Sequence, residues 1–163
     1  PNVVDHDDVN MKNIIEALDS FPNRKIVFWP NNDPFHQEIV DATSKKEEYL
    51  KFKHLPMNLF LMILAHAKCL IGNSSTGIRE SCTFGIPTID IGKRQNGRER
   101  HINVINVPCK IESIKEGIAS MLDKKFDPFS LYGDGKASEQ IVKILKSYNF
   151  LSYKNIQGGR NGK

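Results

Sequence analysis

The sequence predicts an α/β fold: a single Rossmann-like domain with a parallel sheet. Segments with helical and strand patterns alternate along most of the 163 residues. The strand segments are apolar throughout, instead of alternating between apolar and polar residues, which is typical of parallel sheets that helices cover on both faces. A chain of this length is also large enough for one domain with its own hydrophobic core.

The first elements are marked by clear start and stop signals. Apolar residues at helical spacing predict a helix over residues 9–21, which Pro22 ends. A short apolar run predicts a buried strand over residues 25–30. Asp33 and Pro34 then offer an N-cap and a first helical position. The later elements are a helix to about residue 44, strands over residues 49–55, 69–72, 87–92 and 101–107, and helices over residues 57–68, 75–83, 114–122 and 137–148.

Composition excludes several classes of partner. The 23 basic and 19 acidic residues give a net charge of only +4, too mild and too dispersed to indicate nucleic-acid binding. No apolar run approaches the roughly 18 residues that span a bilayer, and no signal peptide is evident, so we expect no membrane partner. Cys69, Cys82 and Cys109 match no zinc pattern, so we expect no metal. Cys69 and Cys82 lie in apolar segments and are expected to be core residues, and reduced thiols fit a cytoplasmic location. We expect no cofactor.

The most informative stretch is the turn between the third predicted strand and the helix after it. Ser74 and Ser75 stand at the start of that helix, where backbone N–H groups and the helix dipole favour a phosphate. Gly77 allows close backbone approach, and the Glu80 carboxylate, about one and a half turns into the helix, could accept hydrogen bonds from ribose hydroxyls. Taken alone, a serine here is better explained as an N-cap worth about 1 kcal/mol, and propensity alone favours Glu80 as an exposed helix carboxylate.

A basic loop follows the next buried strand. Arg94 and Arg98 carry guanidinium groups, whose fork matches phosphate geometry. This loop, the turn at residues 72–75 and the loop at residues 30–33 all begin at carboxyl ends of strands, where open α/β sheets bind ligands. Their convergence predicts one site for a nucleoside diphosphate. Neither a Gly-Lys-Ser/Thr loop nor a Gly-x-Gly-x-x-Gly turn occurs, which disfavours a kinase or an NAD enzyme.

The same residues carry a family resemblance. Residues 72–80 (GNSSTGIRE), 84–92 (FGIPTIDIG) and 93–99 (KRQNGRE) resemble the C-terminal half of the UDP-N-acetylglucosamine 2-epimerases, and the hydrolysing branch is the more similar. The match runs from Asn13 to about Tyr148. It implies that residues 1–148 form the C-terminal, nucleotide-binding domain of a two-domain GT-B-type fold, that residues 149–163 are a polar tail, and that the N-terminal domain lies outside this chain.

The resemblance also implies roles for individual residues. Ser74, Ser75 and Arg94 would hold the diphosphate, Glu80 would bind the ribose, and the backbone of Leu55 would contact the base. Gly77 and Arg98 would complete the substrate site, Arg98 as a second stabiliser of the leaving group.

The implied reaction removes the C2 proton of the sugar, eliminates UDP and hydrates the intermediate, giving N-acetylmannosamine for sialic-acid or surface-polysaccharide synthesis. The acid and base groups would come from the N-terminal domain, so no residue here is a confident catalyst and the chain alone is expected to bind UDP or a UDP-N-acetylhexosamine without turnover. We expect the N-terminal domain as a partner, and a homo-oligomer.

Two other classes stay open. A GT-B-type glycosyltransferase would also use a nucleotide sugar, and an assay without an acceptor would distinguish it. A non-catalytic nucleotide-binding or interaction module is the second alternative. Histidine is a common general acid or base, but no spacing pairs His54 or His101 with a nucleophile, so neither is assigned a catalytic role.

Overall fold

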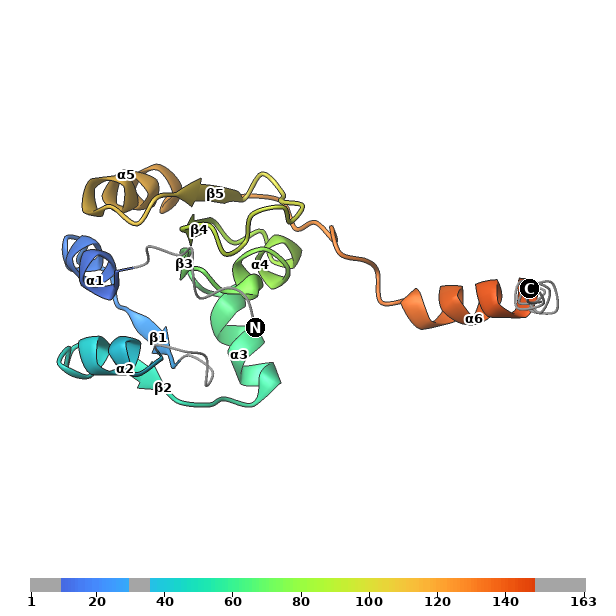
Figure 1. The fold of residues 1–163 in the computed structure, drawn as a ribbon, viewed down its shortest axis with the longest axis horizontal. Helices are drawn as coiled ribbons and strands as arrows, with labels where there is room; N and C mark the ends of the chain where they lie inside the picture. The colour runs from blue at the N-terminus through green and yellow to red at the C-terminus, as the bar shows by residue number, and fades with distance from the viewer. Residues whose placement is uncertain (1–9, 30–35, 149–163) are drawn as a thin grey trace, which may run out of the picture. The chain divides into compact units, whose positions relative to one another are not determined.

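The computed structural model describes residues 10–29 and 36–148 of the chain (Figure 1). The predicted loop at residues 30–33, the Asp33–Pro34 helix start and the tail at residues 149–163 lie outside the described residues. The chain divides into two compact units, Pro1–Leu131 and Tyr132–Lys163. In the first unit the elements are α1 (Met11–Asp19), β1 (Ile26–Phe28), α2 (His36–Ser44), β2 (Leu50–Phe52), α3 (Met57–Ala65), β3 (Leu70–Gly72), the 3₁₀ turn η1 (Ser75–Gly77), α4 (Glu80–Thr83), β4 (Thr88–Ile91), β5 (Val104–Val107) and α5 (Ile111–Met121).

All five predicted strands are present and every pair is parallel, which confirms the α/β class. The strands form two parallel sheets, β1-β2 and β3-β4-β5, where the sequence predicts a parallel sheet. Among the described residues no backbone ladder joins β1 to β3. Each of these two strands is only three residues long, which leaves few backbone groups for a second neighbour.

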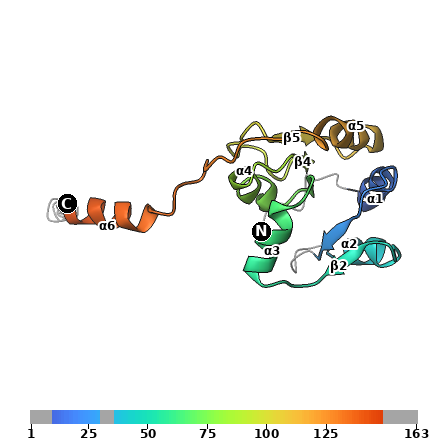
Figure 2. The ribbon, with the colours of Figure 1, turned by 180° about the vertical axis from the view of Figure 1, so that it is seen from behind.

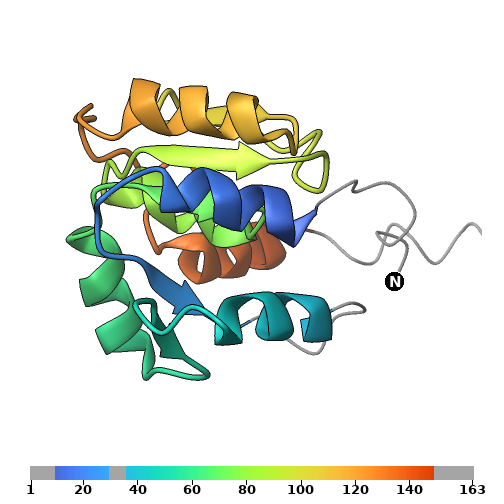
Figure 3. The same ribbon diagram turned by 90° about the vertical axis from the view of Figure 1, so that its left-hand side faces the viewer.

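Helices lie on both sides of the strands, as buried parallel sheets require. Figures 1 and 2 show α1, α2 and α5 on one side and α3 and α4 on the other. In Figure 3, α5 and α1 run side by side, and α5 also packs against β4 and β5. The Asn10 side chain begins α1 by accepting a hydrogen bond from the Lys12 backbone N–H at 2.9 Å.

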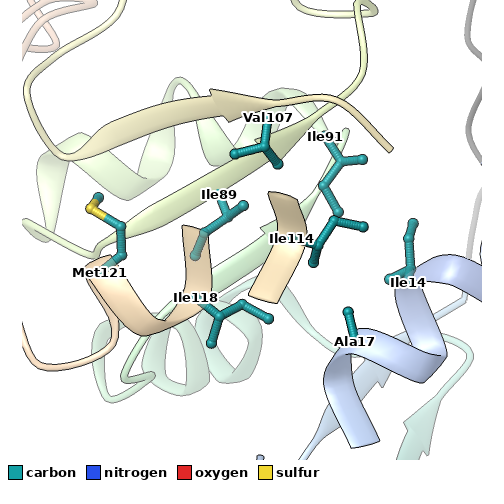
Figure 4. Close-up of a cluster of buried hydrophobic side chains, with 8 residues drawn as sticks. All are labelled: Ile14, Ala17, Ile89, Ile91, Val107, Ile114, Ile118 and Met121. Atoms are coloured by element: carbon teal, nitrogen blue, oxygen red, sulfur yellow. The ribbon is translucent and has the colours of Figure 1, made fainter. Parts of the chain in front are cut away.

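The core lies between α1, α5 and the central strand β4. All four residues of β4 are buried, and its alternating side chains face opposite sides of the sheet. Ile89 and Ile91 point into the apolar cluster drawn in Figure 4. The other members of that cluster are Ile14, Ala17, Val107, Ile114, Ile118 and Met121. The opposite face of β4 carries Thr88 and Asp90, so this strand has an apolar side and a polar side.

The predicted helix over residues 75–83 is wrong in one respect: it is two short pieces, η1 and α4. The Ser81 hydroxyl donates to the Gly77 carbonyl at 2.7 Å, and such a bond competes with the backbone ladder. Ile78, at the break, is fully buried. Packing of this side chain and the serine bond, not helix propensity, set the path of the chain here.

The second unit contains α6 (Ala137–Ser147), which confirms the last predicted helix within one residue. The Asp134 carboxylate accepts a hydrogen bond from the Lys136 backbone N–H at 3.1 Å just before this helix. The large apolar side chains of this helix are 49–61% exposed. They are Ile141, Val142, Ile144 and Leu145. In neither unit do the described residues form a helix long and apolar enough to cross a membrane.

Candidate functional site

Two of the three loops predicted to converge do meet at one sheet edge. β3 and β4 are parallel neighbours, and Gly72 at the end of β3 pairs with Asp90 near the end of β4. The segments after the two strands therefore leave the same edge. They are joined directly, because the Gln95 side-chain amide donates to the Asn73 carbonyl at 2.7 Å. The edge combines a hydroxyl-rich turn with a cationic loop.

The turn after β3 is capped by its own serine. Ser74 has an extended backbone conformation and is exposed, and its Oγ accepts a long bond of 3.4 Å from the Thr76 N–H. Ser75 opens η1 and is half-buried. Gly77 is buried, and a methyl group added there would lie 3.0 Å from Thr88 Cγ2. The space at Gly77 is thus taken by β4, and this glycine lets the turn pack closely on the sheet.

Glu80 is the first residue of α4 and is half-buried. Its Oε2 atom is shielded from solvent and has no hydrogen-bond partner among the described residues. Buried polar atoms are nearly always bonded, so this oxygen lacks a partner that a rotation of the side chain toward a ligand donor would supply. The expectation of an exposed helix carboxylate does not hold for this oxygen.

A buried network of hydrogen bonds holds α4 in place. Asn103, just before β5, donates to Ser81 Oγ at 3.0 Å and to the Ile86 carbonyl at 2.7 Å. Ser81 in turn bonds to Gly77. Because Ser81 directly follows Glu80, this chain determines where the Glu80 backbone lies.

Residues 93–99, which we call the arginine loop, turn sharply. The Asn96 N–H donates to the Lys93 carbonyl at 2.9 Å, and Gly97 has a φ of +78°, a backbone conformation that glycine adopts readily in turns. Arg94 and Arg98 are both exposed. Two guanidinium groups are therefore carried at the same edge as Ser74 and Glu80.

Beneath the arginine loop lies a polar cluster that sequence reasoning missed. Arg100 Nη2 donates to Asp90 Oδ2 at 2.9 Å and to the Gln95 carbonyl at 3.0 Å. Asn106 on β5 donates to the same Asp90 oxygen at 3.0 Å and to the Gly92 carbonyl at 2.7 Å. The sequence feature that could have revealed this cluster is Asp90, a carboxylate within the buried strand β4. A buried charge needs a partner, so Asp90 predicts a cation nearby.

Other predicted residues lie elsewhere or have structural contacts. Leu55 follows β2, in the sheet that does not contain β3 and β4, and is half-buried. His101 stacks on Phe129 with ring centroids 4.5 Å apart. All three cysteines are free, as predicted, and burial raises the pKa of Cys69 to about 11. Within residues 10–29 and 36–148 no cluster of three or more histidine, cysteine or acidic side chains could hold a metal ion.

Known proteins are similar to this chain in sequence and in fold. The family model for UDP-N-acetylglucosamine 2-epimerase matches residues 1–146. A UDP-N,N'-diacetylbacillosamine 2-epimerase (hydrolyzing) from Legionella pneumophila is 32% identical over 148 residues, which is 88% of this chain and 39% of that protein. A UDP-N-acetylglucosamine 2-epimerase from Neisseria meningitidis is 33% identical over 138 residues, 81% of this chain and 37% of that protein.

The fold is shared with a solved structure. The UDP-GlcNAc 2-epimerase of Methanocaldococcus jannaschii, solved in complex with UDP-GlcNAc and UDP, superposes with a TM-score of 0.68 at 20% identity. The alignment covers 84% of this chain and 39% of the archaeal one. The chain thus spans about two fifths of the length of the relatives it matches. The sequence match over residues 1–146 shows that this chain belongs to the UDP-N-acetylglucosamine 2-epimerase family.

Proposed function

We propose that this chain is the UDP-binding half of a hydrolysing UDP-N-acetylglucosamine 2-epimerase. The observation that carries the proposal is Glu80 at the start of α4, shortly after the serine turn: its Oε2 atom is shielded from solvent and has no hydrogen-bond partner among the described residues. A rotation of the side chain toward a ribose hydroxyl would supply the missing donor. The carboxylate would then hold the nucleoside while the adjoining groups hold the diphosphate.

The diphosphate would lie between the turn and the arginine loop. Ser74 is exposed, and the hydrogen bond that its Oγ accepts leaves the hydroxyl proton available for a phosphate oxygen. Ser75 would add a second hydroxyl. Arg94 and Arg98 would bring charge, and guanidinium bonds to phosphate are among the strongest hydrogen bonds in proteins. Because α4 has only four residues, these local groups, and not a long helix dipole, would account for most of the affinity.

Two further residues would act through the backbone. Leu55, in the connection between β2 and α3, would contact the uracil base with its main-chain groups. Gly77 would serve the site by bringing η1 against Thr88, which sets the height of the turn above the sheet.

In the proposed reaction, the C2 proton of the sugar is removed, UDP leaves, and water adds to the glycal intermediate to give the free epimer. The described residues would stabilise the departing diphosphate, which is the charge that develops in the elimination. The acid and base groups would come from an N-terminal domain, so this chain alone should bind UDP without releasing sugar. The sugar would be N-acetylglucosamine or a diacetamido relative, in sialic-acid or surface-polysaccharide synthesis.

Calorimetric titration with UDP, ADP and CMP tests the proposal. We expect UDP to bind best, and Arg94→Ala to raise its Kd by about tenfold or more, as for a lost charge-assisted hydrogen bond. Arg24→Ala removes an exposed arginine from the α1–β1 connection and is the matched control. The titration is repeated on any longer natural polypeptide that contains the chain, together with a sugar-release assay without an acceptor. Failure of both polypeptides to bind UDP would refute the proposal.

A further inference from the structure

The ion pair between Asp90 and Arg100 lies directly under the arginine loop. Asp90 is on the polar side of β4 and its side chain is 2% exposed, whereas that of Arg100 is 26% exposed. Asn106 on the neighbouring strand donates to the same carboxylate oxygen and to the Asp90 carbonyl, each at 3.0 Å. The carboxylate is therefore fixed to the sheet on one side and offers its charge to Arg100 on the other.

Arg100 transmits that fixed position to the loop. Its Nη2 atom, besides bonding Asp90, donates to the Gln95 carbonyl at 3.0 Å. That carbonyl also accepts the Arg98 backbone N–H at 3.3 Å, so it is the centre of the turn that carries the exposed arginines. The Gln95 side chain, itself 2% exposed, reaches Asn73 in the serine turn. Gln95 is thus held at its main chain by Arg100 while its side chain joins the two ligand-bearing segments.

Arg100 differs in this respect from the other arginines of the segment. Arg94 and Arg98 are exposed, while Arg100 points inward, with its Nε atom buried. A guanidinium already bonded to a buried carboxylate has less charge to offer a phosphate. The contacts of Arg100 fit a supporting role, and supporting groups of this kind keep a binding geometry within the tolerance that affinity requires.

We propose that Asp90 and Arg100 are positioning residues for the diphosphate: they act through Gln95 to hold the arginine loop at its distance from the serine turn. This inference rests on the proposed function, since it assumes that the two segments bind a diphosphate. It predicts that loss of the pair weakens the binding of phosphate groups and leaves the binding of the nucleoside nearly unchanged.

The test compares UDP with uridine on the 163-residue chain and on any longer natural polypeptide that contains it. UDP affinity is measured by calorimetry and uridine affinity by ligand-detected NMR. We expect Arg100→Met and Asp90→Ala each to raise the Kd for UDP by about fivefold, with the uridine Kd changed less than about twofold. Arg24→Met, which removes an equal charge elsewhere, should leave both values unchanged.

The sign of the Asp90→Ala effect distinguishes positioning from charge. Removing a negative charge near a phosphate should strengthen UDP binding if charge alone matters, whereas positioning predicts weaker binding. If Asp90→Ala does not fold, Arg100→Met is compared with the wild type at about 0.5 M salt, where exposed charges are largely screened. A positioning effect persists there and a simple charge effect disappears.

Different binding results would overturn this inference and the proposed function. A wild type that binds UDP, with variants whose UDP-to-uridine affinity ratio is unchanged, would overturn the positioning role alone. Tighter UDP binding by Asp90→Ala would do the same. If the wild type binds no UDP in either polypeptide, both proposals are wrong.

Discussion

Replacing Glu80 with methionine should separate stability from binding at a single position. In the unliganded protein this change removes a buried oxygen without a partner, which relieves about 1–3 kcal/mol. It also removes a negative charge from the first turn of α4, which costs about 0.3–1 kcal/mol. Methionine keeps the unbranched stem and its packing. The balance is a stabilisation of about 1 kcal/mol, or roughly 2–4 °C in Tm for a chain of this size.

The same substitution should weaken UDP binding. Loss of hydrogen bonds between a carboxylate and ribose hydroxyls corresponds to about 1.5–3 kcal/mol, which is about 10- to 100-fold in Kd. Thermal unfolding without ligand and calorimetric titration with UDP measure the two effects on one preparation. Glu112→Met, at an exposed glutamate in the first turn of α5, is the matched control and should alter neither strongly.

Either half of this result can refute the reasoning. A Glu80→Met variant that melts well below the wild type, with the control unaffected, would mean that Oε2 stabilises the unliganded fold. An unchanged Kd for UDP would remove Glu80 from the nucleoside site. Opposite signs for stability and affinity are expected only when a side chain is left unsatisfied until its ligand arrives.

Two further predictions concern the fold. Gly85 has a φ of +65°, and a Cβ there would lie 2.1 Å from the Phe126 carbonyl oxygen. Gly85→Ala should therefore lower the free energy of unfolding, measured by urea denaturation, by about 3 kcal/mol. Gly97 also has a positive φ but no atom near its added Cβ, so Gly97→Ala should cost only about 1 kcal/mol, and equal losses would contradict this account. Burial, and then its hydrogen bond to Asp19 at 2.6 Å, raise the pKa of Tyr49 above the usual value. The folded state therefore keeps a proton that the unfolded chain loses, so stability should fall as the pH rises above about 10; Tyr49→Phe should make this decline less steep, and parallel curves from pH 7 to 11 would contradict the assignment.

The strands could be predicted because their signal is local. Apolar runs bounded by proline, glycine and charged residues predicted all five strands, and the structure shortens them by one to four residues. The arrangement into two sheets could not be predicted in the same way. It depends on which short strands share backbone hydrogen bonds, and neighbouring residues in the sequence carry no information about that pairing.

Only part of the candidate site could be predicted from the sequence. The edge formed by β3 and β4 follows from the general rule for parallel sheets, so Ser74 and Arg94 could be named in advance. The break at Ile78 and the role of Arg100 could not, because both depend on contacts across the fold. Sequence patterns give Arg100 no role of its own, because its partner Asp90 lies ten residues earlier on another element.

The hydrogen bond from Asn103 to Ser81 has a consequence for how the site is assembled during folding. Its two residues are 22 positions apart, and β4 lies between them. The turn and α4 are therefore not a self-contained binding motif that could form as soon as its own residues are available. Glu80 reaches its place only when the segment ahead of β5 has docked, so recognition of a nucleotide should be acquired late, together with the completed sheet, and not at the first collapse of the local chain.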